Sequence, residues 1–152
     1  MGWWRSFRHK MRLARGLSWR EWLRLMEAWW RLGRNSMSLR RVSYDQIILQ
    51  TQFNPKGGAT PNNDLVVAQR LQQLVSMAAR IHGTPMTCLS RALTLHQMLA
   101  RDGIRSRVCI GVGKTSNKVQ AHAWVEVAGQ AIGEAEDITT RFKVLDPVKI
   151  KG

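Results

Sequence analysis

The chain is poor in cysteine and has no long apolar run. Cys88 and Cys109 are the two cysteines among 152 residues, too few for a disulfide framework and without the close ligand pairs of a zinc site. No apolar stretch approaches the roughly 18 residues that a membrane span needs, and the first residues lack the apolar core of a secretory signal. We therefore expect a cytoplasmic protein with two free thiols and no metal.

Acidic residues are also scarce, since 10 Asp and Glu stand against 24 Lys and Arg. The net charge of +14 attracts anionic partners over long range. Residues 1–42 hold 11 of the basic residues, two of the acidic ones and six of the seven tryptophans. This composition favours one functional hypothesis, a basic amphipathic binding module for a membrane surface or another anionic partner, without catalysis. Phosphate contacts with nucleic acid would use the same charges, but we expect no nucleic-acid partner.

The basic N-terminal region, residues 1–50, is expected to be helical. Ser18 and Glu21 form a capping-box pattern, and apolar residues then recur at helical spacing, which predicts an amphipathic helix over residues 19–32 that ends at Gly33. Tryptophans are candidates for contact with a substrate or partner: Trp19, Trp22, Trp30 and, later in the chain, Trp124.

The rest of the chain reads as helices followed by strands. We expect a short helix over residues 42–50, a connecting loop over 54–63, and a core over 64–152. One core helix runs from Asn63 or Asp64 to Gly83, and a second begins after Thr87 and stops before Gly103. Alternating patterns then predict strands at 106–113 and 119–127, a turn at 128–130 and an extended segment at 142–145. This order indicates an α+β fold with a small antiparallel sheet.

Cys88 occupies the first turn of the second core helix, where a thiol meets unpaired backbone N–H groups and the positive end of the helix dipole. Both stabilise a thiolate, although a free cysteine is equally at home as a small buried apolar residue. His122 lies inside a predicted strand, where an imidazole fills a core poorly. A cysteine at a helix start and a histidine on a strand can form the thiolate–imidazolium pair of a cysteine nucleophile.

An acidic residue that orients His122 would complete this group. With a three-residue turn at 128–130, His122 lies opposite Glu136 and diagonal to Glu134, within side-chain reach. A two-residue turn flips the register and favours Asp137. The pattern alone leaves all three carboxylates open.

Several other polar residues have plainer interpretations. Trp124 and Glu126 share the strand face of His122, and Ala123 and Val125 lie on the other. We expect one face to meet the Cys88 helix and another helix, for which the tryptophan-rich one is a candidate, to cover the second. Trp124 itself suits either core packing or a substrate cleft. We interpret Cys109 as core filler and His82 as a residue at a helix end. The remaining candidates, for a second oxyanion donor, are Gln52, Gln69 and Gln72.

Five segments together resemble a known family. They are "GLSWREWLRLMEAWWRLG", "TCLSRALTLHQMLARDGI", "RVCIGVG", "AHAWVEV" and "IGEAEDITTRF". The set is similar to the transglutaminase-like cysteine protease of lasso peptide biosynthesis, the leader peptidase component, over nearly the whole chain. The resemblance implies a papain-like or transglutaminase-like core with Cys88 as nucleophile and His122 as base. It also implies an acidic residue twelve positions after the histidine, which is Glu134 here, where the family usually has Asp.

The resemblance further implies a substrate and partners. The substrate would be the precursor of a ribosomally made lasso peptide, cut between leader and core. The implied partners are a separate leader-recognition protein and an asparagine-synthetase-like cyclase that closes the macrolactam. ATP use belongs to the cyclase, and "GVGK" lacks the spacing of a phosphate-binding loop, so we expect no cofactor in this chain.

Overall fold

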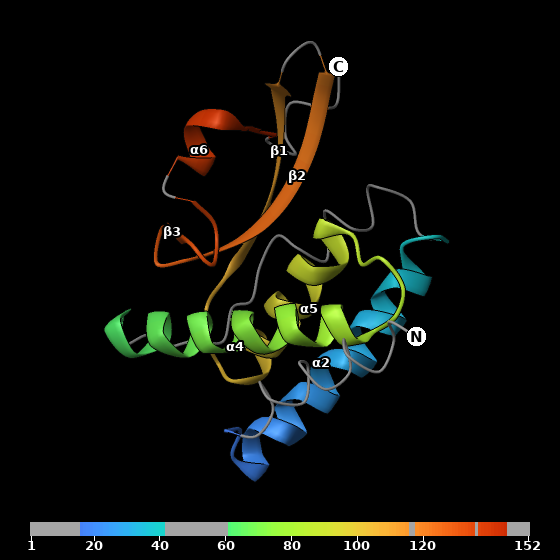
Figure 1. Cartoon of the computed structure of the whole chain (residues 1–152). Coiled ribbons are helices and arrows are strands. Elements are labelled where there is room, and N and C mark those ends of the chain that lie inside the picture. Colours follow the sequence, from blue (N-terminus) through green and yellow to red (C-terminus); the bar gives the residue numbers. More distant parts are fainter. Residues whose placement is uncertain (1–15, 42–60, 116–117, 136, 146–152) are drawn as a thin grey trace.

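The computed structural model describes residues 16–41, 61–115, 118–135 and 137–145. Its elements are the helices α2 (Trp19–Ser38), α4 (Pro61–Ile81) and α5 (Cys88–Arg101), the strands β1 (Arg107–Thr115), β2 (Lys118–Val127) and β3 (Gln130–Ala131), the short helix α6 (Ile138–Arg141) and the strand β4 (Lys143–Val144). In Figure 1 the three long helices lie together below the sheet, and α6 lies beside the β1–β2 hairpin, away from them. The predicted α+β class is confirmed. The helix predicted over 42–50 lies outside the described residues.

Helix α2 begins as the sequence predicts but continues further. Ser18 and Glu21 form the capping box, with the Ser18 N–H donating to the Glu21 carboxylate over 2.9 Å. The predicted end at Gly33 is wrong, because the helix runs on to Ser38. A Cβ at Gly33 would lie 3.1 Å from Nε2 of His82, so this glycine admits a neighbouring side chain instead of ending the helix. Buried Leu32 and Asn35 hold the backbone on either side of it.

Helices α4 and α5 supply much of the core. Helix α4 starts at Pro61, two residues before the predicted cap, because proline suits the first helical position, where its missing N–H costs nothing. The last residues of the predicted 54–63 loop are therefore helical. Helix α5 has the predicted cap, with Thr87 Oγ1 accepting from the Ser90 N–H over 3.2 Å. Its end is also confirmed, since Gly103 has a φ of +75° and follows the last turn directly.

The three long helices share one apolar core. Leu25, Ala28 and Leu32 of α2 belong to the same buried cluster as side chains of α4, α5 and the sheet. A polar contact joins two of the helices inside it, because the buried amide of Asn35 donates to Thr94 Oγ1 over 3.0 Å. Full burial of a large apolar side chain contributes roughly 1.5–3 kcal/mol, so Leu25 and Leu32 help to hold α2 on this core. No helix in the described part of the chain is long and apolar enough to span a membrane.

The sheet is antiparallel in the order β3-β2-β1-β4. On β2, Ala123 and Val125 are 5% and 1% exposed and face the helical core. The opposite face carries Trp124, which packs with Cys109, Ile138 and Phe142. The helix that covers this second face is therefore α6. The prediction that the tryptophan-rich α2 could cover it is wrong. The close packing requires glycine on β1, because a Cβ at Gly111 would lie 2.8 Å from the Trp124 ring.

Candidate active site

Cys88 is the first residue of α5, and its thiol is half-buried. The Thr87 cap satisfies the N–H of Ser90. The N–H groups of Cys88 and Leu89, at the first two helical positions, have no carbonyl partner within the helix. The residue that carries the thiol therefore lies at a helix end with two backbone donors that have no partner within the helix.

His122 lies on β2 directly opposite Gly111 of β1. Its ring packs near two aromatic rings, with centroid distances of 6.1 Å to Trp124 and 5.4 Å to Phe142. Its Nε2 lies 3.1 Å from a carboxylate oxygen of Glu134. Because this contact occupies Nε2, Nδ1 is the ring nitrogen left to exchange a proton with another group.

Glu134 reaches His122 by a route that the sequence pattern did not predict. The turn has two residues, Ala128 and Gly129, both with positive φ, and Val127 pairs with Gln130. The predicted three-residue turn is wrong, because this pair adopts the primed geometry that matches the twist of a hairpin. The chain then leaves the ladder after β3 and bends at Gly133, whose φ is +72°.

The other two carboxylates considered as the group that orients His122 were Asp137 and Glu136. The Asp137 carboxylate lies 3.9 Å from Nε of Arg141, and both side chains are more than half exposed. The two-residue turn therefore does not bring Asp137 to His122. Glu136 lies outside the described residues. Glu134 is the predicted acidic residue that the structure places against the imidazole.

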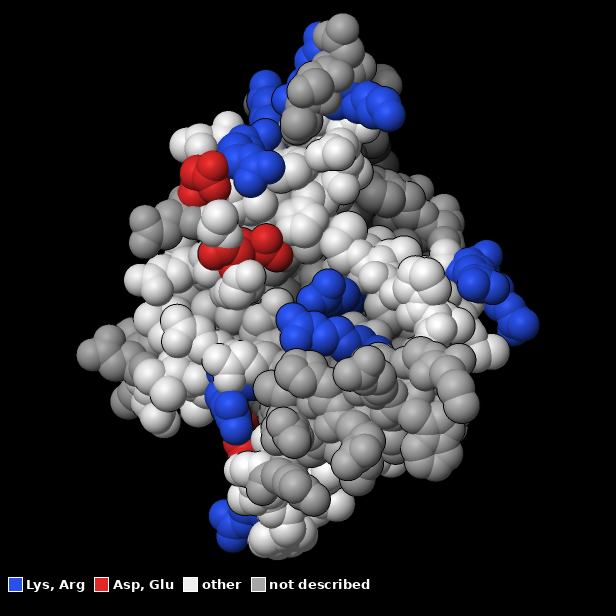
Figure 2. Space-filling view, in the orientation of Figure 1, with Lys and Arg blue, Asp and Glu red and all other residues white. Residues whose placement is uncertain are grey.

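Cys88, His122 and Glu134 line one pocket of about 380 Å³. Its polar and charged wall is completed by Gln72, Ser76, Arg80 and Arg91. No hydrogen bond joins the described residues Cys88 and His122. The face in Figure 2 carries acidic and basic side chains close together near its centre. Three predicted residues from separate segments thus share one opening.

The pocket also contains residues that the sequence analysis did not single out. Arg91 lies one helical turn after Cys88, and its guanidinium donates to Ser76 Oγ of α4 over 3.0 Å. Residues three apart share a helix face, so Arg91 could have been found from Cys88 by spacing. Ser76 and Arg80 carry no such signal, because the packing of α4 against α5 is set by non-local contacts.

Of the three glutamines predicted as candidates for the second oxyanion donor, the structure places one in the pocket. Gln72 lines the pocket and packs against Gly133, where a Cβ would lie 2.5 Å from the Gln72 Cγ. Gln69 is exposed and is not among the pocket residues. Gln52 lies outside the described residues. Gln72 is therefore the glutamine placed to donate to a group bound near Cys88.

The predicted binding tryptophans fall into two environments. Trp124 is 2% exposed, and its Nε1 donates to the Glu126 carboxylate over 3.2 Å, so its main contribution is packing at the pocket edge. Trp19, Trp22 and Trp30 lie on the solvent side of α2, and Trp19 and Trp30 are 69% and 67% exposed. These three are at the surface, away from the pocket.

The other cysteine and the other histidines among the described residues lie outside the pocket. Burial and the neighbouring Glu126 raise the pKa of the Cys109 thiol to about 12, which keeps it protonated. Burial lowers the pKa of His96, whose Nδ1 lies 2.8 Å from Ser106 Oγ. His82 stacks on Trp29 at 5.0 Å. The described residues contain no group of three or more His, Cys, Asp or Glu that could hold a metal ion.

Comparison with known protein families identifies the superfamily of this chain. The model of the transglutaminase-like superfamily matches residues 17–146, from the cap of α2 to just past β4. No curated protein and no solved structure matches the chain. Because the match covers most of the sequence, the chain belongs to the transglutaminase-like superfamily.

Proposed function

We propose that this member of the transglutaminase-like superfamily is a cysteine peptidase in which Cys88, His122 and Glu134 form the catalytic triad. The observation that carries the proposal is that these three residues, from the start of α5, from β2 and from the bend after β3, line one pocket. The 3.1 Å contact between His122 and Glu134 supplies the base and its orienting acid.

In the proposed reaction, Nδ1 of His122 takes the Cys88 proton, and the thiolate attacks the scissile carbonyl carbon. The tetrahedral intermediate collapses as the imidazolium protonates the leaving amine, which leaves a thioester on Cys88. A water molecule, deprotonated by His122, then attacks the thioester and releases the carboxylate product and the thiol. Glu134 holds the ring and stabilises its charged form in each half-reaction.

Two donors are proposed for the oxyanion. The backbone N–H of Cys88 is free at the start of α5, and the amide of Gln72 borders the same pocket. Donors fixed before the reaction stabilise the developing negative charge without reorganising. Arg91, on the thiol's face of α5 and held by Ser76, adds positive potential to this wall.

The proposed substrate is the precursor of a ribosomally made lasso peptide, cut between leader and core in the cytoplasm. The support is the resemblance of five segments, which include those around Cys88, His122 and Glu134, to the leader peptidases of that pathway. On this proposal a separate recognition protein holds the leader, and an asparagine-synthetase-like cyclase closes the macrolactam after the cut.

A second candidate function is partner binding without catalysis. It is favoured by the exposed tryptophans and arginines of α2. It gives no role to the pocket around Cys88, so a test of catalysis separates the two functions.

The test is a cleavage assay with a lasso precursor and its recognition protein, followed by mass spectrometry. The unmodified chain should release the leader and Cys88→Ala should release none. Cys109→Ala is the matched control, since this buried thiol lies in a separate cluster, and it should keep the activity if its thermal melt shows a folded protein. Cleavage that survives in Cys88→Ala would refute the assignment.

A further inference from the structure

A second pocket, of about 580 Å³, lies along the outer side of α2 and the end of α5. We call it the arginine groove, and its lining is Arg20, Leu23, Arg24, Glu27, Trp30, Arg31, Arg34 and Arg101. The α2 residues recur every three or four positions, so they form one stripe along the helix. Five arginines thus line the groove with one carboxylate, Glu27, and one of them, Arg24, also contacts Asp102 outside the lining over 2.7 Å.

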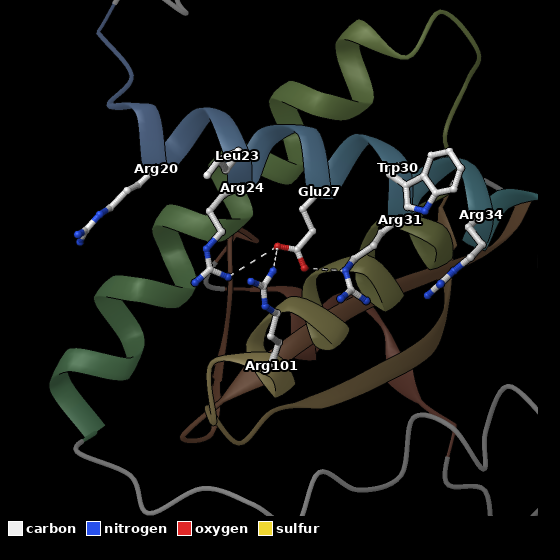
Figure 3. Close-up of a pocket in the computed structure, with 8 residues that line it drawn as sticks. All are labelled: Arg20, Leu23, Arg24, Glu27, Trp30, Arg31, Arg34 and Arg101. Carbon is white, nitrogen blue, oxygen red and sulfur yellow. Dashed lines mark hydrogen bonds and ion pairs between the residues drawn. The ribbon is translucent and has the colours of Figure 1, made fainter.

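The charges in the arginine groove do not balance. Glu27 already accepts hydrogen bonds from Arg31 and Arg101, and Figure 3 shows this cluster in the middle of the row. Burial would raise the pKa of Glu27, but the bonds from Arg101 and Arg31 outweigh it and lower that pKa, so the carboxylate stays ionised and engaged. Arg20 and Arg34 stand at the two ends of the row (Figure 3), and neither forms an ion pair with another described residue. The groove therefore presents uncompensated cations at both ends.

Apolar side chains are exposed in and beside the same groove. Leu23 and Trp30 line it, each with more than half of its surface open to solvent. Neighbouring positions of α2 expose Trp19, Trp22, Met26 and Met37. All basic residues of α2 are arginines. Enrichment in Trp, Met and Arg with depletion of Lys characterises surfaces that bind proteins. Arginine is preferred to lysine there because its guanidinium group is weakly hydrated and binds a carboxylate with two parallel hydrogen bonds.

We propose that the arginine groove docks a partner protein through an acidic segment that also carries apolar side chains. Carboxylates of the segment pair with Arg20 and Arg34, and its apolar side chains cover Leu23 and Trp30. Along the helix axis Arg20 and Arg34 are about 21 Å apart. A helical segment of roughly 15 residues lying beside α2 spans both.

Charge argues against the chain itself as occupant. The long segments outside the described residues are 1–15, 42–60 and 146–152, and none has a net negative charge. A second copy is also unsuited, because most of its described carboxylates are already engaged: Glu21, Glu27, Asp102, Glu126 and Asp137 contact arginines and Glu134 contacts His122. Among the described carboxylates this leaves Asp64, a single charge, for a groove with a free arginine at each end. The acidic segment therefore comes from a different protein.

The docking proposal is independent of the peptidase activity proposed above. Arg101 ends α5 and Cys88 begins it, and the helix between them is about 20 Å long. A partner bound in the groove thus leaves the Cys88 pocket open, and binding can be measured in a Cys88→Ala protein.

The test measures binding to the full chain by fluorescence anisotropy. The main probe is a labelled helical peptide of about 20 residues with Glu on one face and Leu on the other. Anionic phosphatidylglycerol vesicles and a short DNA duplex are the two comparison probes. The peptide should bind saturably, and Arg20→Glu/Arg34→Glu should weaken it roughly tenfold or more, as expected when two close charge pairs become repulsive. Trp30→Ala should weaken it as well.

The matched control is Lys114→Glu/Lys118→Glu at the tip of the β1–β2 hairpin, where both side chains are exposed. It changes the net charge equally, and at physiological salt it should alter peptide affinity by less than about threefold. Equal losses in both double variants would mean that net charge alone binds the peptide, and would overturn the proposal. Vesicle or DNA binding that depends on Arg20 and Arg34, with no effect of these residues on the peptide, would overturn it in favour of a membrane or nucleic acid.

Discussion

Replacement of Glu134 by glutamine isolates the charge that orients His122. The two side chains are 28% and 23% exposed, and Nε2 lies 3.1 Å from the carboxylate. A hydrogen bond to a charged group contributes about 1.5–3 kcal/mol, and partial exposure places this one in the lower half, near 1.5–2 kcal/mol. Glutamine keeps the shape and an acceptor oxygen but removes the charge that stabilises the imidazolium. The expected loss in kcat/KM is roughly 10- to 30-fold.

The assay is the rate of leader release, measured at several precursor concentrations so that kcat and KM separate. The loss should fall on kcat, because Glu134 acts on the proton transfers and not on substrate binding. Asp137→Asn is the matched control, since the Asp137 carboxylate contacts exposed Arg141 and not His122, and its rate should stay within about twofold of the unmodified chain. A Glu134→Gln protein as fast as the unmodified chain would refute the role of Glu134.

Further predictions concern the pocket wall and the core. Gln72→Ala should lower kcat of leader release by roughly 100-fold if the amide binds the oxyanion, while the exposed Gln69→Ala should not; equal rates in both would exclude Gln72. Leu32→Ala should destabilise the protein by about 2–5 kcal/mol in urea unfolding, because Leu32 is buried. Trp30→Ala should destabilise it by less than about 1 kcal/mol, because Trp30 is exposed. Similar losses in the two variants would contradict the packing of α2. Burial lowers the pKa of His96, so the folded state binds its proton less readily than the unfolded chain. The stability that His96 contributes should be full above about pH 6.5 and should fall as the pH drops toward the lowered pKa. His96→Gln should flatten that fall when the free energy of unfolding is measured in urea at several pH values.

Local signals predicted the starts of α2 and α5 and the end of α5. The capping residues Ser18, Glu21 and Thr87 act on N–H groups within one turn, and Gly103 supplies a left-handed residue directly after the helix. Such contacts need no knowledge of the rest of the fold. They were therefore readable from the order of residues alone.

The failures arose where a distant segment decides the local structure. Gly33 is a typical helix end, but the His82 side chain occupies the space beside it, and this neighbour is invisible in the local sequence. The cover over Trp124 is likewise non-local, because it comes from Ile138 of α6 and from Phe142. A short helix of four residues gives almost no periodic signal.

Among the active-site residues, some positions follow from local signals and others depend on distant segments. The position of Cys88 follows from its cap, and that of His122 from the alternation of its strand. Glu134 was expected on the hairpin ladder, whereas a bend at Gly133 brings it to His122. Gln72 reaches the pocket because α4 packs across the start of α5, and side-chain spacing within one helix does not encode that crossing.

The most direct test of the central claim is covalent trapping of the nucleophile. A leader peptide that ends in a chloromethyl ketone would be incubated with the full chain, and the modified residue would be located by peptide mass spectrometry. Cys88 should be alkylated, at a slower rate in His122→Ala than in the unmodified protein. Alkylation of Cys109 instead, or an unchanged rate at Cys88 without the imidazole, would contradict this claim.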